Sequence, residues 1–389
     1  MTVPDPAVDD PDDPSYGIFG RTDYEASRPS KRDFKPWHLP RKQFVRSEQW
    51  VDQALKVFEG RCDDQPVRYL GLPGVDLLDL RYFHGKVCGP LSRSLRYLGF
   101  NSEAGSGDAA EVDLNTSLDE VARLGEVDPQ SLVVRDDFRS LAREDSIAWQ
   151  RAKGLGPFDV VNLDFCDGIA SGDPGANGSL YQAMGKLLAL QVRSQHPWLL
   201  LVTTRIGRDH FDADALARLL GHLRSNLGSC ESFVDACREL FGANEPASVD
   251  ASTCSADVFL KMLLLSLCKW LLMLGQASSP NRVELASSQG YRVNGGADCI
   301  DLISFALVFK AVMAAPADAL GAGPAQGIDE CAEATRIAGR VRSLKDVDEI
   351  LDGDGDLAER LASQTELLLK SARYDTSSYR SWLAMVPGE

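Results

Sequence analysis

A repeated alternation of short apolar segments and helix-length stretches is the feature that most constrains this chain. The apolar segments have the length of β-strands and lie at 67–70, in S-L-R-Y-L-G-F, in S-L-V-V-R, at 160–163 and in W-L-L-L-V-T-T. The segment at 160–163 is apolar on both of its faces, which is typical of a strand buried between two layers of helices. Strands about 30 residues apart fit βαβ units. The sequence therefore predicts an open, doubly wound and mostly parallel α/β sheet.

The overall composition is that of a soluble globular protein. Its 389 residues are 44% hydrophobic and 25% charged, with a net charge of −16, which excludes a surface that is basic throughout but allows a local basic patch. The nine cysteines are scattered, without a C-x-x-C pair or the spacing of a zinc site. Residues 1–15 are acidic and Pro-rich and do not resemble a secretory signal. These features predict a cytoplasmic protein with mostly buried thiols and no metal site.

The most hydrophobic segment, 257–276, approaches the length of a membrane span. It contains Lys261 and Lys269, each of which costs about 2.5 to 3.5 kcal/mol near the centre of a bilayer. The segment is therefore predicted to be a buried helix on a face of the sheet, and no membrane contact is expected.

Composition divides the chain into four parts. Residues 1–30 form an acidic arm that is disordered or bound to a partner, because it holds too little apolar surface to fold alone. Residues 31–65 form a basic-aromatic segment and an amphipathic helix that is predicted to begin at Ser47 and to end at Gly60. The α/β domain covers 66–313, with a helical insertion at about 211–276, and 314–389 contain a linker and a C-terminal helical appendage. The acidic arm and the C-terminal helices are the predicted sites for protein partners.

Cations and aromatic residues alternate between residues 31 and 46. Such a pattern suits phosphate contact combined with base stacking, and it predicts nucleic-acid contact through Arg41, Lys42 and Arg46. The alternative is an extended segment whose aromatic side chains attach it to the core while its charges stay in solvent. The sequence alone leaves both open.

Glycines and polar side chains follow the first four predicted strands. Parallel strands end at one edge of a sheet, and ligands of open α/β sheets bind beyond the carboxyl ends of the strands. Glycines allow a ligand to approach the backbone closely, and carboxylates accept hydrogen bonds from hydroxyl or amino groups. The candidates, in strand order, are Gly71 and Gly74, then Asn101 and Glu103, then Asp136, Asp137 and Phe138, and finally Asn162, Asp164 and Phe165.

In this order of features the chain resembles the class I S-adenosylmethionine-dependent methyltransferase superfamily, which is Rossmann-like, over roughly residues 66–310. The segments 281–285 and 290–293 are also predicted to be strands near the end of the domain. The resemblance implies a seven-stranded sheet whose last strand, at 300–309, is inserted antiparallel. It also implies S-adenosylmethionine as cofactor. Gly71 and Gly74 would lie under its methionine part, Asn101 or Glu103 at its ribose, and Asp136 or Asp137 with Phe138 at its adenine.

The resemblance implies that 162–165, N-L-D-F, faces the methyl acceptor, with Asn162, Asp164 and Phe165 as catalytic residues. This segment partly matches the N-P-P-F/Y motif of amino-group methyltransferases but lacks both prolines. The turn at R-Y-L-G-L-P-G is a further departure, because it has two glycines instead of three and no preceding acidic residue.

Two functional hypotheses follow. In the first, the protein is an enzyme that methylates a nucleic acid or another large substrate, with Asn162 and Asp164 orienting the nucleophile. In the second, it is a catalytically inactive subunit of methyltransferase fold that serves as an interaction module in a bacterial multi-protein complex. The altered glycine turn favours the second hypothesis, and the acidic strand ends favour the first.

Overall fold

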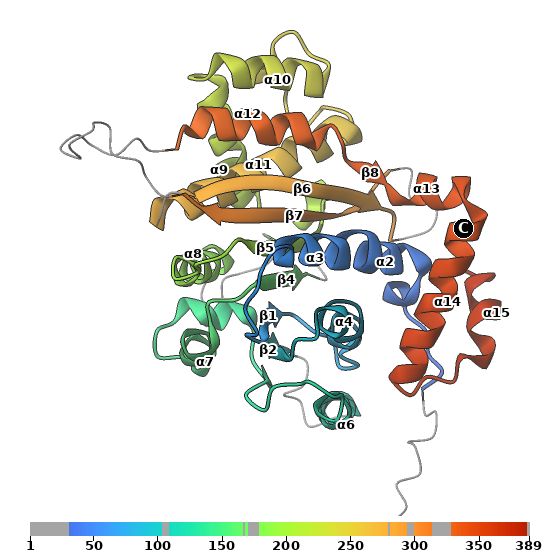
Figure 1. Cartoon of the computed structure of the whole chain (residues 1–389). Coiled ribbons are helices and arrows are strands. Elements are labelled where there is room, and N and C mark those ends of the chain that lie inside the picture. The colour runs from blue at the N-terminus through green and yellow to red at the C-terminus, as the bar shows by residue number, and fades with distance from the viewer. Residues whose placement is uncertain are drawn as a thin grey trace, which may run out of the picture.

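The structure is a computed structural model, and it describes residues 31–102, 109–165, 168–169, 179–278, 281–293, 299–312 and 328–386. A single sheet in the order β3-β2-β1-β4-β5-β7-β6-β8 forms its centre (Figure 1). The strands are β1 (Val67–Gly71), β2 (Leu95–Phe100), β3 (Leu132–Val134), β4 (Val160–Asp164), β5 (Trp198–Arg205), β6 (Asn281–Tyr291), β7 (Leu302–Ala311) and β8 (Lys345–Asp346). The fold is mixed α/β with a mostly parallel sheet, as predicted, and is compatible with a Rossmann-like fold.

The strand pairing agrees with the sequence analysis in the first five strands, which are parallel to one another. β7 lies between β5 and β6 and is antiparallel to both, the position expected for the last strand. Two expectations need correction. The segments 281–285 and 290–293, read as separate strands, belong to one strand that continues through a register shift between Leu285 and Ser287. The sheet also has eight strands instead of seven, because β8 pairs with β6.

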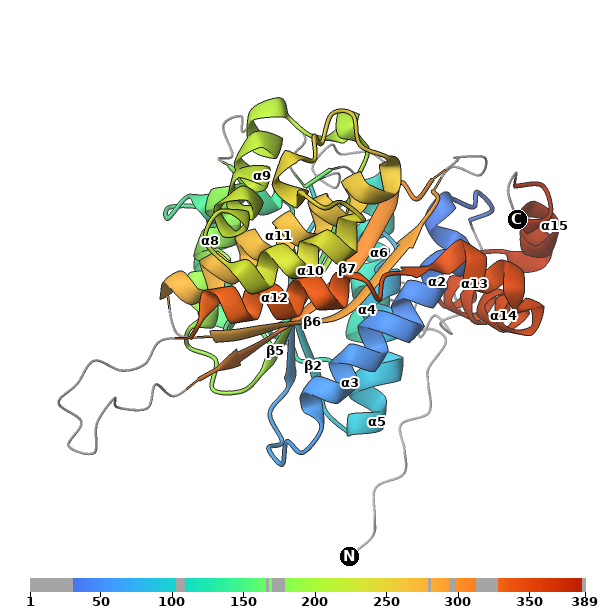
Figure 2. The same ribbon diagram turned by 90° about the horizontal axis from the view of Figure 1, so that it is seen from above.

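One face of the sheet is covered by helices that lie between residues 147 and 341. These are α7 (Ile147–Leu155), α8 (Leu180–Gln191), α9 (Ala213–Leu227), α10 (Glu231–Phe241), α11 (Ala256–Ser278) and α12 (Glu330–Val341). Figure 2 shows α8 to α12 from above. By length and composition α11 is the one described helix that could span a membrane, but 78% of its most apolar stretch is buried. It serves as a core helix, in agreement with the prediction for 257–276.

The opposite face is covered mainly by helices from the first third of the chain. A continuous N-terminal helix comprises α2 (Pro40–Val45), the π-helical η2 (Arg46–Val51) and α3 (Asp52–Phe58), and it lies along the sheet (Figure 1). It starts at Pro40, earlier than the predicted Ser47. Beside it lie α4 (Leu78–Phe83), η3 (His84–Cys88), α5 (Gly89–Leu91) and α6 (Ala109–Ala122).

The C-terminal appendage packs against the start of the described chain. It consists of α13 (Val347–Gly353), α14 (Gly355–Ser371), the short η8 (Thr376–Ser378) and α15 (Tyr379–Leu383). Phe34 packs between the rings of Tyr374 and Tyr379, and the Tyr379 hydroxyl donates to the carbonyl of His38 at 2.6 Å. The aromatic side chains therefore attach residues 31–39 to the core, as the alternative interpretation of this segment expected. That interpretation also expected solvated charges, but Arg41, Lys42 and Arg46 are buried.

The N-terminal helix is fixed to the sheet by its π-helical segment. Trp50 is only 4% exposed, and its indole N–H donates to the Ser304 hydroxyl of β7 at 3.4 Å. The side-chain amide of Gln49 donates to the Ser304 carbonyl at 3.0 Å. Two consecutive side chains thus place this helix over the middle of the sheet.

Replacing Trp50 by Ala tests this attachment. The change removes a large buried side chain and its indole donor, so the free energy of unfolding should fall by about 3–5 kcal/mol. Lys56→Ala, on the exposed side of the same helix, is the matched control and should change it by less than about 0.5 kcal/mol. Urea unfolding of the two variants measures both values, and equal stability would show that the helix is not part of the core.

Candidate functional site at the carboxyl edge of the sheet

The ends of β1 and β4 lie side by side at the carboxyl edge of the sheet. Gly71 is the register partner of Asn162, and Asp164 follows two residues later beside Thr203 of β5. The prediction that Asp164 emerges at the same edge as the glycine turn is therefore confirmed. Asn162 is buried, with 2% of its surface exposed, whereas the Asp164 side chain keeps 23%.

Asn162 is held by Tyr69 from the neighbouring strand. Its side-chain amide donates to the Tyr69 hydroxyl at 2.9 Å, and its carbonyl oxygen has no hydrogen-bond partner among the described residues. Burial, reinforced by the charge of Asp79, raises the pKa of Tyr69 well above its usual value, so the phenol stays neutral. The side-chain NH₂ group of Asn162 is therefore used within the protein, and only its carbonyl oxygen remains to contact another molecule.

The ring of Tyr69 also explains why residue 71 is a glycine. A Cβ atom at position 71 would lie 2.6 Å from Cε1 of Tyr69, so any larger residue would displace the ring. By contrast, a Cβ atom at Gly74 would have no heavy atom within 4 Å. The glycine predicted to lie under the methionine part of a cofactor is thus required by an internal aromatic side chain, and Gly74 faces open space.

Asp164 forms an ion pair with Lys42 of α2, with 2.6 Å between Nζ and Oδ2. The Lys42 ammonium also lies 4.7 Å from the centroid of the Trp50 ring, a cation–π contact. Burial, the largest single effect, lowers the pKa of Lys42, but the combined attraction of Asp164, Tyr291 and Asp79 outweighs it and raises the pKa above the usual 10.5. The N-terminal helix thus places a fixed positive charge on the acidic side chain that was predicted to meet the substrate.

The structure places Arg41, Lys42 and Arg46, the residues predicted to contact nucleic acid, in the interior of the protein. All three are buried, with 2–4% of their surface exposed. Arg41 pairs with Asp348 at 3.3 Å, and Arg46 pairs with Asp79 at 2.8 Å. A phosphate could reach these cations only by displacing internal carboxylates. The cations that alternate with aromatic residues in the sequence therefore serve the interior of the protein.

The residues predicted for the ribose and adenine parts of a cofactor are also engaged internally. Asn101 donates to the Pro73 carbonyl in the glycine turn at 2.9 Å. Asp137 caps η5 (Phe138–Ala142) by accepting from the Arg139 backbone N–H at 2.7 Å, and it pairs with the Arg139 guanidinium. Asp136 accepts from the Asp137 backbone N–H at 2.8 Å. Glu103, the alternative ribose ligand, lies outside the described residues.

Two predicted site residues, Phe138 and Phe165, do come together. Their ring centroids lie 6.4 Å apart in an edge-on arrangement, and Phe100 contacts Phe138 from the other side at 5.8 Å. Phe165 remains half-buried. Phe138 and Phe100 are buried, with 4% and 3% of their surface exposed, so Phe165 is the ring of this cluster that a planar ligand could contact.

Taken together, the candidate residues do not line one open site. Tyr69 fills the space expected for the methionine part of the cofactor, and Lys42 covers it. The space beside Phe138 and Phe165, expected for the adenine, is the part that is not filled in this way. Two cavities of the described structure lie elsewhere. One, of about 520 Å³, lies among Pro40, α14 and α15, and the other, of about 350 Å³, lies at the opposite edge of the sheet beside Arg61 and Asp159. Among the described residues no cluster of His, Cys, Asp or Glu is arranged to hold a metal ion.

Sequence reasoning missed Tyr69 as a site residue, and it assigned Lys42 to nucleic-acid contact instead of to Asp164. Lys42 lies 122 positions before its partner Asp164 in the chain, and no local pattern pairs them. The sequence did contain a signal for Tyr69, because this tyrosine lies near the first glycine, where the methyltransferase superfamily that the chain resembles has an acidic residue.

Comparison with known proteins gives a matching family and distantly similar solved structures. A family model described as PP_RS20740-like matches residues 31–384. No curated protein matches the chain. Among solved structures, the cyclopropane synthase MmaA2 from Mycobacterium tuberculosis is 11% identical, with a TM-score of 0.26, over 67% of this chain and 82% of that chain.

Asp164→Asn tests the ion pair. Removing the carboxylate leaves the Lys42 ammonium buried without its counter-charge, so the free energy of unfolding at pH 7 should fall by about 1–3 kcal/mol. Because folding raises the pKa of Lys42, the stabilisation is complete below pH 10.5 and is lost as the pH rises through the folded-state pKa. The difference between parent and variant should therefore shrink above pH 10.5.

Asp52→Asn is the matched control, since Asp52 pairs with Lys56 on the surface of the same N-terminal helix. An exposed pair of this kind contributes about 0.3–0.5 kcal/mol. Thermal unfolding of both variants between pH 7 and pH 11 makes the comparison. If Asp164→Asn behaved like Asp52→Asn at every pH, the ion pair would have no structural role.

Proposed function

The chain belongs to the PP_RS20740-like family, and we propose that it is a protein of methyltransferase-like fold that works by binding a protein partner and not by methyl transfer. The observation that carries this proposal is the occupation of the reactive end of β4. Asp164 is neutralised by Lys42 of the same chain, and Asn162 donates to Tyr69. A methyl acceptor would need these side chains to face an open site.

The additions to the α/β domain support a binding role. The N-terminal helix and the C-terminal helices enclose the cavity of about 520 Å³, on the side of the molecule formed by α14 and α15 in Figure 1. Small side chains of α14, Ala358 and Ala362, line it together with Leu383 of α15, and Glu359 and Arg380 supply charge. Small residues on one helix allow a second helix to approach closely. A helix of a partner protein is the occupant that this groove suits.

A second candidate is binding of S-adenosylmethionine, and one observation favours it. Phe138 and Phe165 meet beside Asp136 and Asp137, which is where the resemblance puts the adenine. This candidate requires the Tyr69 ring to move away from Gly71, because the ring now fills the space under the expected methionine part.

Calorimetric titration with S-adenosylmethionine and S-adenosylhomocysteine separates the two candidates. The binding role predicts no heat of binding at millimolar ligand, because the internal contacts of Tyr69 and Lys42 close the site. Gly74→Trp supplies the control, since position 74 has space for a larger side chain and the variant should fold. Micromolar binding by the parent that is lost in Gly74→Trp would overturn the proposal in favour of cofactor binding.

The partner groove has its own test. Ala358→Arg places a long charged side chain in the groove, and Ala122→Arg makes the same change on the exposed end of α6. Each variant, expressed as the full chain in its native host, would be purified under mild conditions and the stoichiometric co-purifying proteins compared. We expect one protein to be retained with the parent and Ala122→Arg and lost with Ala358→Arg. Equal recovery with both variants would exclude the groove as the binding site.

A further inference from the structure

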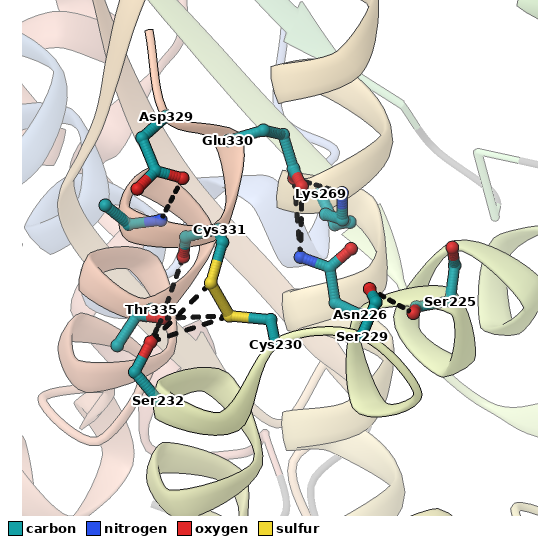
Figure 3. Close-up of a disulfide and its surroundings, with 11 residues drawn as sticks. Ser225, Asn226, Ser229, Cys230, Ser232, Lys269, Asp329, Glu330, Cys331 and Thr335 are labelled. Carbon is teal, nitrogen blue, oxygen red and sulfur yellow. Dashed lines mark hydrogen bonds and ion pairs between the residues drawn. A yellow bond between two sulfur atoms is a disulfide. The ribbon is translucent and has the colours of Figure 1, made fainter.

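A disulfide joins Cys230 at the start of α10 to Cys331 at the start of α12 (Figure 3). Both helices belong to the layer that also contains α11. The two residues are 101 positions apart in the sequence, and their Cα atoms lie 5.9 Å apart, within the usual range for a disulfide. The sequence analysis expected mostly buried thiols, and Cys88, Cys237 and Cys268 fit that expectation. Burial raises the pKa of the Cys88 and Cys237 thiols to about 12, so these cysteines are poor nucleophiles. The bonded pair is therefore chemically distinct from the buried cysteines.

Both bonded cysteines lie at the beginning of a helix. Cys230 is the N-cap residue of α10, a helix of 11 residues, and Cys331 lies in the first turn of α12. The partial positive charge at a helix N-terminus stabilises a thiolate. Hydroxyl groups add to this environment, because the Ser232 hydroxyl lies 3.5 Å from the sulfur of Cys230 and 3.6 Å from that of Cys331.

The bond is accessible from one side. Cys230 is buried, with 5% of its surface exposed, whereas Cys331 is half-buried and the adjacent Ser232 is exposed. Figure 3 shows Ser232 and Thr335 next to the two sulfur atoms. A small thiol can therefore approach Cys331, and the sulfur of Cys230 is placed to leave as a thiolate.

We propose that Cys230 and Cys331 form a reversible redox-modification site whose substrates are small thiols and disulfides. In reduction, an external thiolate attacks the Cys331 sulfur, the bond between the two protein sulfurs breaks, and Cys230 leaves as a thiolate. A second external thiol then releases Cys331. The sum is one protein disulfide plus two thiols giving two protein thiols plus one external disulfide, and oxidation is the reverse exchange. In a reducing compartment, which the sequence predicts, a disulfide is expected to be transient in this way.

The exchange would act on the attachment of α12. Several contacts hold the beginning of this helix. Asp329 caps it at 3.2 Å through the Ala332 N–H, Glu330 pairs with the buried Lys269 of α11 and accepts from the Asn226 amide at 3.2 Å, and Cys331 is bonded to α10. Reduction removes the covalent contact and leaves the noncovalent ones. The chain continues from α12 through β8 to α13, where Asp348 pairs with Arg41 of α2. A looser attachment of α12 would therefore be passed along the chain to the contact between α13 and α2.

The test is a redox titration of the full-length protein. Samples equilibrated with mixtures of reduced and oxidised glutathione are quenched with acid, unfolded, labelled with N-ethylmaleimide and mapped by mass spectrometry. We expect Cys230 and Cys331 to lose their labels together as oxidised glutathione increases, and to regain them when reduced glutathione is restored. A trapped mixed disulfide should carry glutathione on Cys331. Labels that persist at every ratio, or a bond that resists reduction at every ratio, would each overturn the proposal.

Hydrogen exchange gives an independent readout of the attachment. In the parent, reduction should raise the exchange rate of the Ala332 amide several-fold, and Cys331→Ser should have the raised rate without reductant. Cys254→Ser, which replaces a cysteine outside the pair, is the control and should follow the parent in both measurements. An exchange rate at Ala332 that is the same in oxidised parent, reduced parent and Cys331→Ser would show that the bond does not hold α12.

Discussion

The contact between Lys42 and Asp164 determines how the rest of the molecule is arranged. A lysine that is 4% exposed has lost most of its hydration, which costs several kcal/mol unless an opposite charge compensates for it. Asp164 supplies that charge at 2.6 Å. The N-terminal helix can therefore lie against the sheet only in the position that brings Lys42 to the end of β4, and the attachments of Gln49 and Trp50 to β7 agree with that position.

The same contact connects the fold to the proposed function. An acidic side chain at the end of an inner parallel strand is where an open α/β sheet usually meets its ligand. Here the ligand position is taken by the chain's own N-terminal helix, which is in turn covered by the C-terminal helices. In the proposed function, the surface that binds other molecules therefore lies on the helical additions and not at the edge of the sheet.

The sequence predicted the sheet well because the signal is local. Apolar runs such as 160–163 report burial on both faces, and this fixes strand positions and parallel pairing without knowledge of distant contacts. The site was predicted only in part. Gly71, Asn162 and Asp164 do meet at one edge, but their partners Tyr69 and Lys42 depend on which segment covers that edge. Alternating cations and aromatic residues have the same composition whether they face a polyanion or internal carboxylates, so the sequence of 31–46 could not distinguish the two.

The two ends of the sheet have a consequence for how the protein associates with itself. β3 has three residues, and β8 has two. At the β8 end, α12 also packs against β6. An exposed strand with unpaired backbone groups invites another chain to add a strand and continue the sheet into an aggregate. β8 pairs with Gln289 and Gly290 alone of the 11-residue β6, so residues 281–288 of β6 have no strand partner on that side among the described residues. This stretch, against which α12 packs, is where another copy of the chain could extend the sheet.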